Sequence, residues 1–232
     1  MLSVGLVRSA LAGSVGGFLA VSTDDLYHGL SETAGEPSLA AGFDYRTDRD
    51  VFAGLTAATV NLNPGPSAPV ELGAFVGRAV EWGADWSGRV QLSHDEYPGD
   101  PSGVGYAYSE AVASLAWREL LTATLAYSPD ATRFSTQGFN RHRAAAAVEG
   151  AGHWPFAGHW VLSAGLGYRQ FAAPIATGYA YGSVGLSVTV GRWQADLGLV
   201  EASRRAQSLF GAGIAERRCV FTVSLRFADG VF

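Results

Sequence analysis

Apolar and polar residues alternate one by one along most of this chain. The segment 38–46 reads SLAAGFDYR, and its larger apolar residues fall at every second position. The same period recurs over 160–169, 183–190 and 220–227, where most intervening positions hold serine, glycine, threonine or arginine. A period of two predicts β-strands that have one apolar and one polar face.

Read this way, the whole chain predicts an all-β protein of about twelve strands. Their approximate bounds are Gly17–Asp24, Pro37–Arg46, Asp50–Leu62, Val70–Trp82, Trp86–Glu96, Gly105–Trp117, Leu120–Ser128, Arg141–Gly150, His159–Phe171, Tyr179–Val190, Arg192–Glu201 and Arg217–Phe227. Because a soluble sandwich also alternates in this way, the period alone does not decide the architecture.

The connections between the strands are alternately short and long. Short links are expected at Thr47–Arg49, Gly83–Asp85, Arg118–Glu119 and Gly191, with a somewhat longer one at Ala151–Gly158. Long polar or glycine-rich links are expected at Asn63–Pro69, Pro98–Val104, Pro129–Asn140 and Ala202–Glu216. This alternation is typical of a transmembrane antiparallel up-and-down β-barrel, whose turns lie on the periplasmic side and whose loops lie outside. An even number of strands places both chain ends on the side of the short turns.

Composition supports a membrane barrel. Charged residues make up 16% of the chain, against about 25% in soluble domains. No run of 18 uncharged apolar residues is present, which argues against helical membrane spans. All six tryptophans lie in or beside expected short turns, and eight of nine tyrosines lie toward expected long loops. Two aromatic belts of this kind are expected at the two membrane interfaces.

No linker divides the chain, so residues 17–232 are expected to form a single β-barrel domain. Residues 1–16 are apolar apart from one arginine and a few small polar residues, and they are interpreted as a signal-peptide remnant or a lead-in to the first strand. The net charge of −5 and the absence of lysine argue against a nucleic-acid partner. The single Cys219 cannot form an intramolecular disulfide.

Several short motifs carry a family resemblance. They are Ser22-Thr23-Asp24, His28-Gly29-Leu30-Ser31, Gly35-Glu36-Pro37, Gly42-Phe43-Asp44-Tyr45, Phe52-Ala53-Gly54, Tyr97-Pro98-Gly99, Ser109-Glu110 and Tyr127-Ser128-Pro129-Asp130. Together they resemble the Gcw_chp family of uncharacterised bacterial barrel proteins, over most of the chain to about Phe171. The resemblance implies the bacterial outer membrane and supplies no catalytic residues. This chain has Asp25 where the family usually has an aromatic residue, and His28 where it usually has an arginine.

Nothing in the sequence predicts a catalytic, cofactor or metal site. The five histidines lack the ligand spacing that zinc requires. His142 and several serines are present, but no local motif links them into a hydrolase triad. The stretch 211–213, GAG, lacks the strand-to-helix context of a phosphate loop.

The candidate functional residues are charged side chains on the inner face. By parity, the lumen-lining candidates are Asp44, Glu71, Arg89, Asp95, Glu110, Arg143, Glu149, Arg169, Asp196 and Arg226, six acids and four arginines. Such charges either line a water path or pair across a filled interior. The leading prediction is therefore a narrow porin-like passive channel for small solutes, in contact with outer-membrane lipid. The alternatives are a non-conducting barrel whose outer loops bind a partner or surface polymer, and an outer-membrane lipid hydrolase. The oligomeric state stays open.

Overall fold

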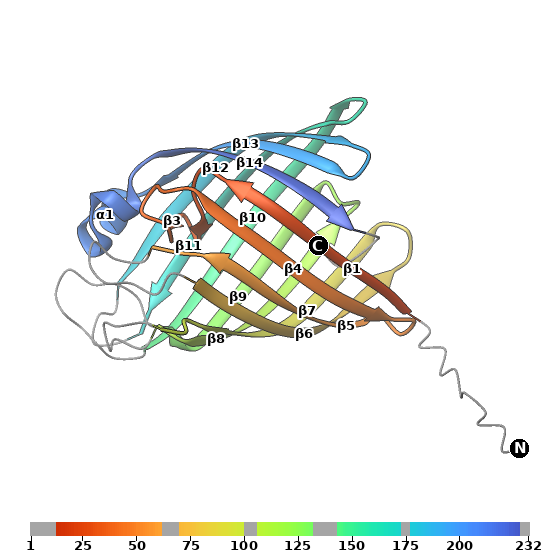
Figure 1. Cartoon of the computed structure of the whole chain (residues 1–232), viewed down its shortest axis with the longest axis horizontal. Helices are drawn as coiled ribbons and strands as arrows, with labels where there is room; N and C mark the ends of the chain where they lie inside the picture. The colour runs from red at the N-terminus through yellow and green to blue at the C-terminus, as the bar shows by residue number, and fades with distance from the viewer. Residues whose placement is uncertain (1–12, 62–69, 100–105, 132–142, 173–176, 228–232) are drawn as a thin grey trace, which may run out of the picture.

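The chain forms a closed antiparallel β-barrel. The structure is a computed structural model, and it describes residues 13–61, 70–99, 106–131, 143–172 and 177–227. Every barrel strand pairs with the next one along the chain, and the first strand also pairs with the last to close the ring of twelve. Figure 1 shows the strands running diagonally around the barrel. The predicted fold class is confirmed.

The barrel strands agree with the alternating pattern in number and order. They are β1 (Gly13–Ser22), β4 (Ser38–Thr47), β5 (Val51–Thr59), β6 (Val70–Trp82), β7 (Trp86–Glu96), β8 (Tyr108–Trp117), β9 (Leu121–Ala131), β10 (Arg143–Ala157), β11 (Trp160–Phe171), β12 (Gly178–Val190), β13 (Trp193–Ala202) and β14 (Arg218–Phe227). A separate hairpin pairs β2 (Leu26–Tyr27) with β3 (Leu30–Ser31). Two short helices, α1 (Arg204–Phe210) and α2 (Ala212–Ala215), precede β14.

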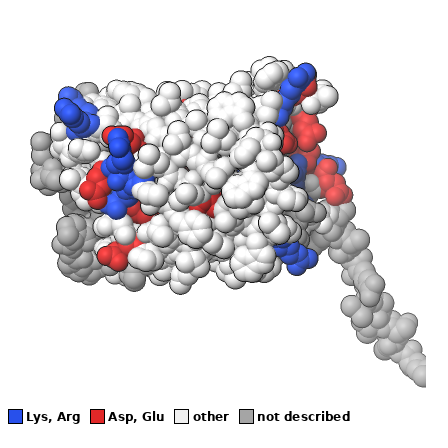
Figure 2. Space-filling model, turned by 90° about the horizontal axis from the view of Figure 1, so that it is seen from above, with Lys and Arg blue, Asp and Glu red and all other residues white. Residues whose placement is uncertain are grey.

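Exposure alternates along each strand and separates an inner from an outer face. Outward positions such as Leu125 and Leu166 are 62% and 76% exposed, whereas inward positions such as Asp44 and Arg169 are 0% and 1% exposed. Charged side chains gather at the two ends of the barrel, and the band between them is almost free of charge on the face in Figure 2. An apolar band of this kind is the surface that contacts lipid in outer-membrane barrels.

All five turns at one end are short. They lie at 48–50, 83–85, 118–120, 158–159 and 191–192, and β1 begins and β14 ends at this same end (Figure 1). The expected longer link at Ala151–Gly158 is wrong, because β10 continues to Ala157 and turns at Gly158, which has a φ of 59°. A register shift between Pro155 and Ala157 accommodates the proline that made the segment look like a loop.

Three other expectations about the chain's organisation change. β1 begins at Gly13, four residues before the expected start, so residues 13–16 of the expected signal-peptide remnant or lead-in belong to the barrel. Residues 1–12 of that segment lie outside the described residues. The expected loop Ala202–Glu216 contains α1 and α2, and the first long link contains the β2–β3 hairpin. Neither helix is long and apolar enough to cross a membrane, and the described ranges hold no other helix.

The tyrosines have a different role from the one expected. Five tryptophans are exposed near the short turns, as an interfacial belt requires. At the other end, only Tyr127 and Tyr168 are strongly exposed outward, whereas Tyr97, Tyr106, Tyr108 and Tyr179 are buried. The loop-end tyrosines therefore pack mainly inside the mouth of the barrel, and the expectation of a tyrosine belt there is largely wrong.

Candidate functional site: the mouth of the barrel

The site begins with the turn between β2 and β3. His28 and Gly29 have φ angles of 49° and 77°, so both central residues of this two-residue hairpin are left-handed. Two positive φ angles are the signature of a type I′ turn, where Asn and Gly are preferred and histidine is uncommon. Gly29 is also required for space, because a Cβ atom there would lie 2.5 Å from Cβ of Tyr181. The hairpin tip is thus held in close contact with the inner wall.

The tip bridges strands that lie apart on the inner wall. His28 Nδ1 is 2.7 Å from Glu149 Oε1 on β10 and 2.8 Å from the Tyr181 hydroxyl on β12. His28 Nε2 is 3.5 Å from Glu110 Oε2 on β8, which also accepts a hydrogen bond of 2.7 Å from the Tyr27 hydroxyl. The Tyr181 hydroxyl donates to Glu149 as well. Contacts to β8, β10 and β12 place the tip inside the mouth (Figure 1).

Arg169 supplies a buried positive charge to this cluster. Its guanidinium carbon lies 5.0 Å from the Tyr27 ring and 5.6 Å from the Phe171 ring. It also attracts the carboxylates of Glu110 and Glu149. Its Nε and Nη1 atoms are buried without a hydrogen-bond partner in the described part of the chain. A buried cation of this kind depends on nearby carboxylates and aromatic faces to offset its desolvation.

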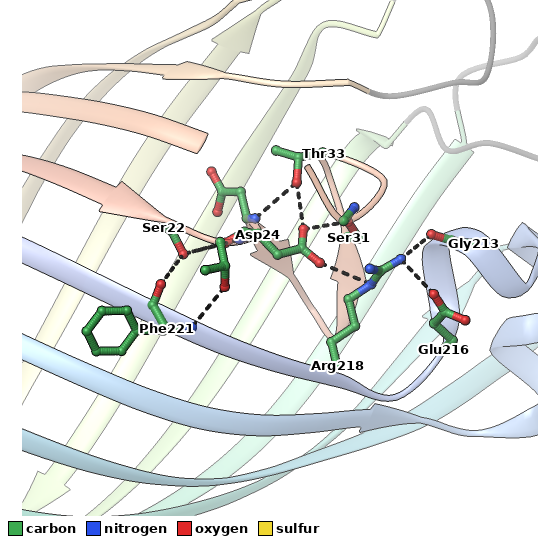
Figure 3. Close-up of polar contacts among 11 residues, drawn as sticks. Ser22, Asp24, Ser31, Thr33, Gly213, Glu216, Arg218 and Phe221 are labelled. Atoms are coloured by element: carbon green, nitrogen blue, oxygen red, sulfur yellow. Dashed lines mark hydrogen bonds and ion pairs between the residues drawn. The ribbon is translucent and has the colours of Figure 1, made fainter. Parts of the chain in front are cut away.

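A second group of contacts attaches the base of the loop to the wall (Figure 3). The buried Asp24 accepts hydrogen bonds of 2.6 Å from Ser31 and 2.7 Å from Thr33, and its other oxygen is 3.0 Å from Arg218 Nε. Arg218 also donates to the Gly213 carbonyl of α2 and lies 3.2 Å from Glu216. One arginine at the start of β14 therefore holds both the hairpin loop and the helical segment, and we call this group the Asp24–Arg218 latch.

Apolar side chains cover the hairpin from the outside. Leu30 of β3 lies in a buried cluster with Phe171 and Tyr179 of the wall and with Ala206 and Phe210 of α1. Phe210 packs on Tyr179 with ring centroids 5.5 Å apart. The helix α1 is short, so it depends on this contact rather than on its own hydrogen bonds for stability. α1 therefore packs against Leu30 and the wall at the mouth of the barrel.

The base of the loop also holds a carboxyl group with an unusual affinity for protons. Burial, reinforced by the charge of Glu32, raises the pKa of Asp25 from 3.8 to about 6. The backbone N–H of Leu26 opposes this shift by hydrogen-bonding to the charged form. Above about pH 6, the Asp25 carboxylate therefore adds negative charge at the mouth.

The ten lumen-lining candidates do not form one ring. Glu110, Glu149 and Arg169 meet at the hairpin tip, and Glu71 accepts a hydrogen bond of 2.7 Å from the Tyr97 hydroxyl near the same end. Asp95 is buried beside Tyr108, also near this end. The remaining candidates lie elsewhere: Asp44 and Arg89 on the wall of β4 and β7, Asp196 on β13, and Arg143 and Arg226 near strand ends.

The inner wall combines large buried side chains with small residues that stay partly exposed. On β4–β7, Asp44 and Phe52 are buried, and Arg89 lies over the Phe52 ring at 4.4 Å from its centroid. On β11–β14 many inward positions are small, and they stay partly or fully exposed toward the short-turn end. These inward residues are Ser163, Gly165, Ser183, Gly185, Ser187, Thr189, Gly198, Thr222 and Ser224. These small inward residues leave part of the lumen along β11–β14 open to solvent.

A separate polar group lies on the outer face near the loop end. His94 Nδ1 is 3.0 Å from Ser109 Oγ, and His94 Nε2 is 3.0 Å from Glu96 Oε1. Ser109 Oγ also lies 3.3 Å from Asp130 Oδ2. Sequence reasoning found no serine–histidine–carboxylate arrangement because these residues belong to two strands joined by a long loop. In the described ranges, no group of three or more histidine, cysteine or acidic side chains has a metal-binding arrangement.

Sequence reasoning also missed the hairpin itself and its tyrosine partners. The alternation of faces could have placed the tyrosines inside the barrel. Tyr108 lies on the same strand face as Glu110, and Tyr179 and Tyr181 lie on the same face as Ser183. Nothing comparable marks the hairpin, because β2 and β3 have two residues each.

Solved structures of porins share this fold. The NanC porin matches with a TM-score of 0.61 at 9% identity, covering 93% of this chain and 100% of that chain. The KdgM porin matches with a TM-score of 0.56 at 9% identity, covering 92% and 99%. KdgM in complex with disordered oligogalacturonate matches with a TM-score of 0.53 at 9% identity, covering 93% and 98%. No curated protein sequence matches the chain significantly. The model of Gcw_chp, described as a bacterial protein of unknown function, matches residues 10–226, and the chain therefore belongs to the Gcw_chp family.

Proposed function

We propose that this protein is a bacterial outer-membrane channel that passes small polar solutes passively, with the β2–β3 hairpin as its constriction. The observation that carries the proposal is the exposed, small-residue side of the lumen on β11–β14. A filled barrel has no need to keep inward serines and glycines in contact with solvent. The shared fold with porins, one of them solved with an oligosaccharide, supports the same reading.

The hairpin accounts for a narrow rather than a wide passage. A barrel of twelve strands is intermediate between small barrels filled by side chains and the 16–18-stranded barrels with wide channels. Here the tip residues Tyr27 and His28 extend into the mouth and contact Glu110 of β8 and Glu149 of β10 on the inner wall. A solute entering from the loop end would pass this cluster before it reaches the open side of the lumen.

Single-channel conductance in a planar bilayer tests the proposal. The wild-type protein should show a small, steady conductance. The Gly29→Ala variant should conduct more, because a Cβ atom at this position collides with Tyr181 and displaces the tip. Gly83→Ala is the matched control, since Gly83 also has a positive φ (65°) but lies in a short turn with no heavy atom near its Cβ position. It should conduct like the wild type.

Replacing residues 26–31 with glycine and serine removes the tip entirely and should give the largest conductance. If none of these proteins conducts, the barrel is non-conducting and its outer loops are the place to look for a bound partner or surface polymer. If only the variants conduct, the hairpin closes the wild-type lumen completely, which contradicts a passive channel.

A second candidate function is hydrolysis of lipid esters at the outer face. The contacts of His94 with Ser109 and Glu96 are those that a nucleophile, a base and an orienting group require. Ser109 Oγ would attack the acyl carbon while His94 takes its proton and passes it to the leaving alcohol. Water would then release the acyl group. The contact between Ser109 and Asp130 competes with this geometry and would have to break.

The refolded protein, incubated with a phospholipid ester, tests this activity. Release of fatty acid should disappear in Ser109→Ala and persist in Ser93→Ala, whose serine lies on the inner face of β7. Equal release from the wild type and Ser109→Ala, or no release from either, excludes the serine mechanism. Neither result affects the conductance experiment.

A further inference from the structure

One arginine interrupts the apolar outer surface. Arg78 lies on the exposed face of β6, and its neighbours across the two strand ladders are Val51 and Val90. Among the described barrel strands, every other charged side chain on this face lies within two residues of a strand end, such as His94, Glu96 and Glu201. A cation that faces lipid needs an anion or a route to the interface.

The protein supplies no anion for Arg78. No residue in the described ranges forms an ion pair or hydrogen bond with its guanidinium. Asp50 is adjacent in the ladder, since its carbonyl accepts from the Ala79 N–H, but its carboxylate is 2.7 Å from Arg46 Nη2. Arg78 therefore has no counter-ion within the described chain, and an external anion can pair with it.

Arg78 lies at one end of an apolar groove on the outer face. The groove has a volume of about 710 Å³ and crosses from β5 to β10. Ala111, Ala113 and Ala146 form its shallow floor, and Leu92 and Leu125 stand beside them. The floor of the groove is low because these three alanines are smaller than the valine and leucine side chains beside them.

The size and direction of the groove fit one lipid leaflet. The ladders join Arg78 to Val90, Val90 to Ala113, and Ala113 to Leu125, with β10 one strand further. Four steps between neighbouring strands span roughly 19 Å. With a strand tilt of roughly 40°, the line rises about 12 Å from the short-turn end toward the loop end. One leaflet of the hydrocarbon core is about 15 Å thick.

We infer that this groove binds a glycerophospholipid of the inner leaflet, with an acyl chain over the alanine floor and the phosphate against Arg78. Charge complementarity selects the headgroup, because Arg78 is the one cation in the lining and no acid shares it. Guanidinium and phosphate form strong paired hydrogen bonds. The inference rests on the proposed membrane location and is independent of whether the lumen conducts.

Native mass spectrometry of the refolded, full-length protein with phosphatidylglycerol tests the site. The wild type should retain lipid at collision energies that strip it from Arg78→Leu, with at least about a tenfold loss of affinity in the variant. Arg78→Lys should retain an intermediate amount, because a lysine supplies the charge without the paired hydrogen bonds. Ala113→Leu should also lose lipid, although its charge is unchanged.

Arg49→Leu is the control, since Arg49 is an exposed arginine in the nearby 48–50 turn, and it should bind lipid like the wild type. Heat-modifiable migration confirms that each variant is folded. Equal retention by the wild type and Arg78→Leu overturns the inference. The inference is also overturned if the wild type forms a dimer that excludes lipid and if Arg78→Glu dissociates this dimer. A second copy of the chain would then occupy the groove. Unchanged conductance in Arg78→Leu would separate this result from the proposed channel.

Discussion

At the scale of single residues, the first loop contains its own source of pH dependence. The pKa of Asp25 rises from 3.8 to about 6 because the docked loop buries its carboxyl group near Glu32. The loop in its position at the mouth thus favours the protonated form of Asp25. The contribution of Asp25 to the stability of this position is fully present below pH 4 and is lost as the pH rises through about 6. A shift of this size corresponds to at most about 3 kcal/mol, and solvent screening reduces it.

Asp25→Asn should therefore stabilise the docked loop at neutral pH and remove most of its pH dependence between 4 and 7. Hydrogen exchange of residues 23–33, corrected for the intrinsic rate at each pH, measures the docking directly. In the wild type, protection should fall across this range, and in Asp25→Asn it should stay nearly constant. Glu36→Gln, at an exposed acid of the same loop, is the control and should behave like the wild type. Equal pH dependence in both variants would exclude Asp25 as the source.

At the scale of elements, the period of two carried almost all the information that the barrel strands required. β6 and β7 match the sequence expectation at both ends, because the Gly83–Asp85 turn separates two long alternating runs. The expected strand ends at Gly150, whereas β10 continues to Ala157 through a register shift beside Pro155. The local pattern is enough to predict the number and order of the strands. Whether a strand continues past a proline depends on its pairing with the partner strand, which the local pattern does not show.

The hairpin in the mouth could not be predicted in the same way. β2 and β3 are too short to show a period, and His28 is not a residue that type I′ turns favour. Its position is fixed by Glu110, Glu149 and Tyr181, which lie between 80 and 155 residues further along the chain. Parity identified these two acids as inward-facing, but only the fold shows that they hold a histidine rather than line an open ring.

At the scale of the whole molecule, the lumen contains both buried and solvent-exposed acidic side chains. Asp44 on β4 and Phe52 on β5 are buried, whereas Asp196 on β13 is partly exposed. Gln194 Nε2 donates to both carboxylate oxygens of Asp196 at 2.9 and 3.0 Å, which keeps the charge facing the open side. Glu110 and Glu149 on the wall, together with Asp25 and Glu32 in the loop that carries the hairpin, add further acids at the mouth. An ion that enters the proposed channel would therefore meet acidic side chains at both levels.

The whole-molecule charge pattern predicts a preference for cations. Asp196→Asn should reduce the cation preference while leaving the barrel folded, because it removes one charge from the solvent-exposed side of the lumen. The reversal potential in a salt gradient measures this, both in the wild type and in the variant with residues 26–31 replaced. Glu201→Gln is the matched control, since Glu201 lies on the outer face and pairs with Arg217 at 2.6 Å. It should leave the reversal potential unchanged. An anion-selective wild type would show that arginines, rather than these acids, control the path.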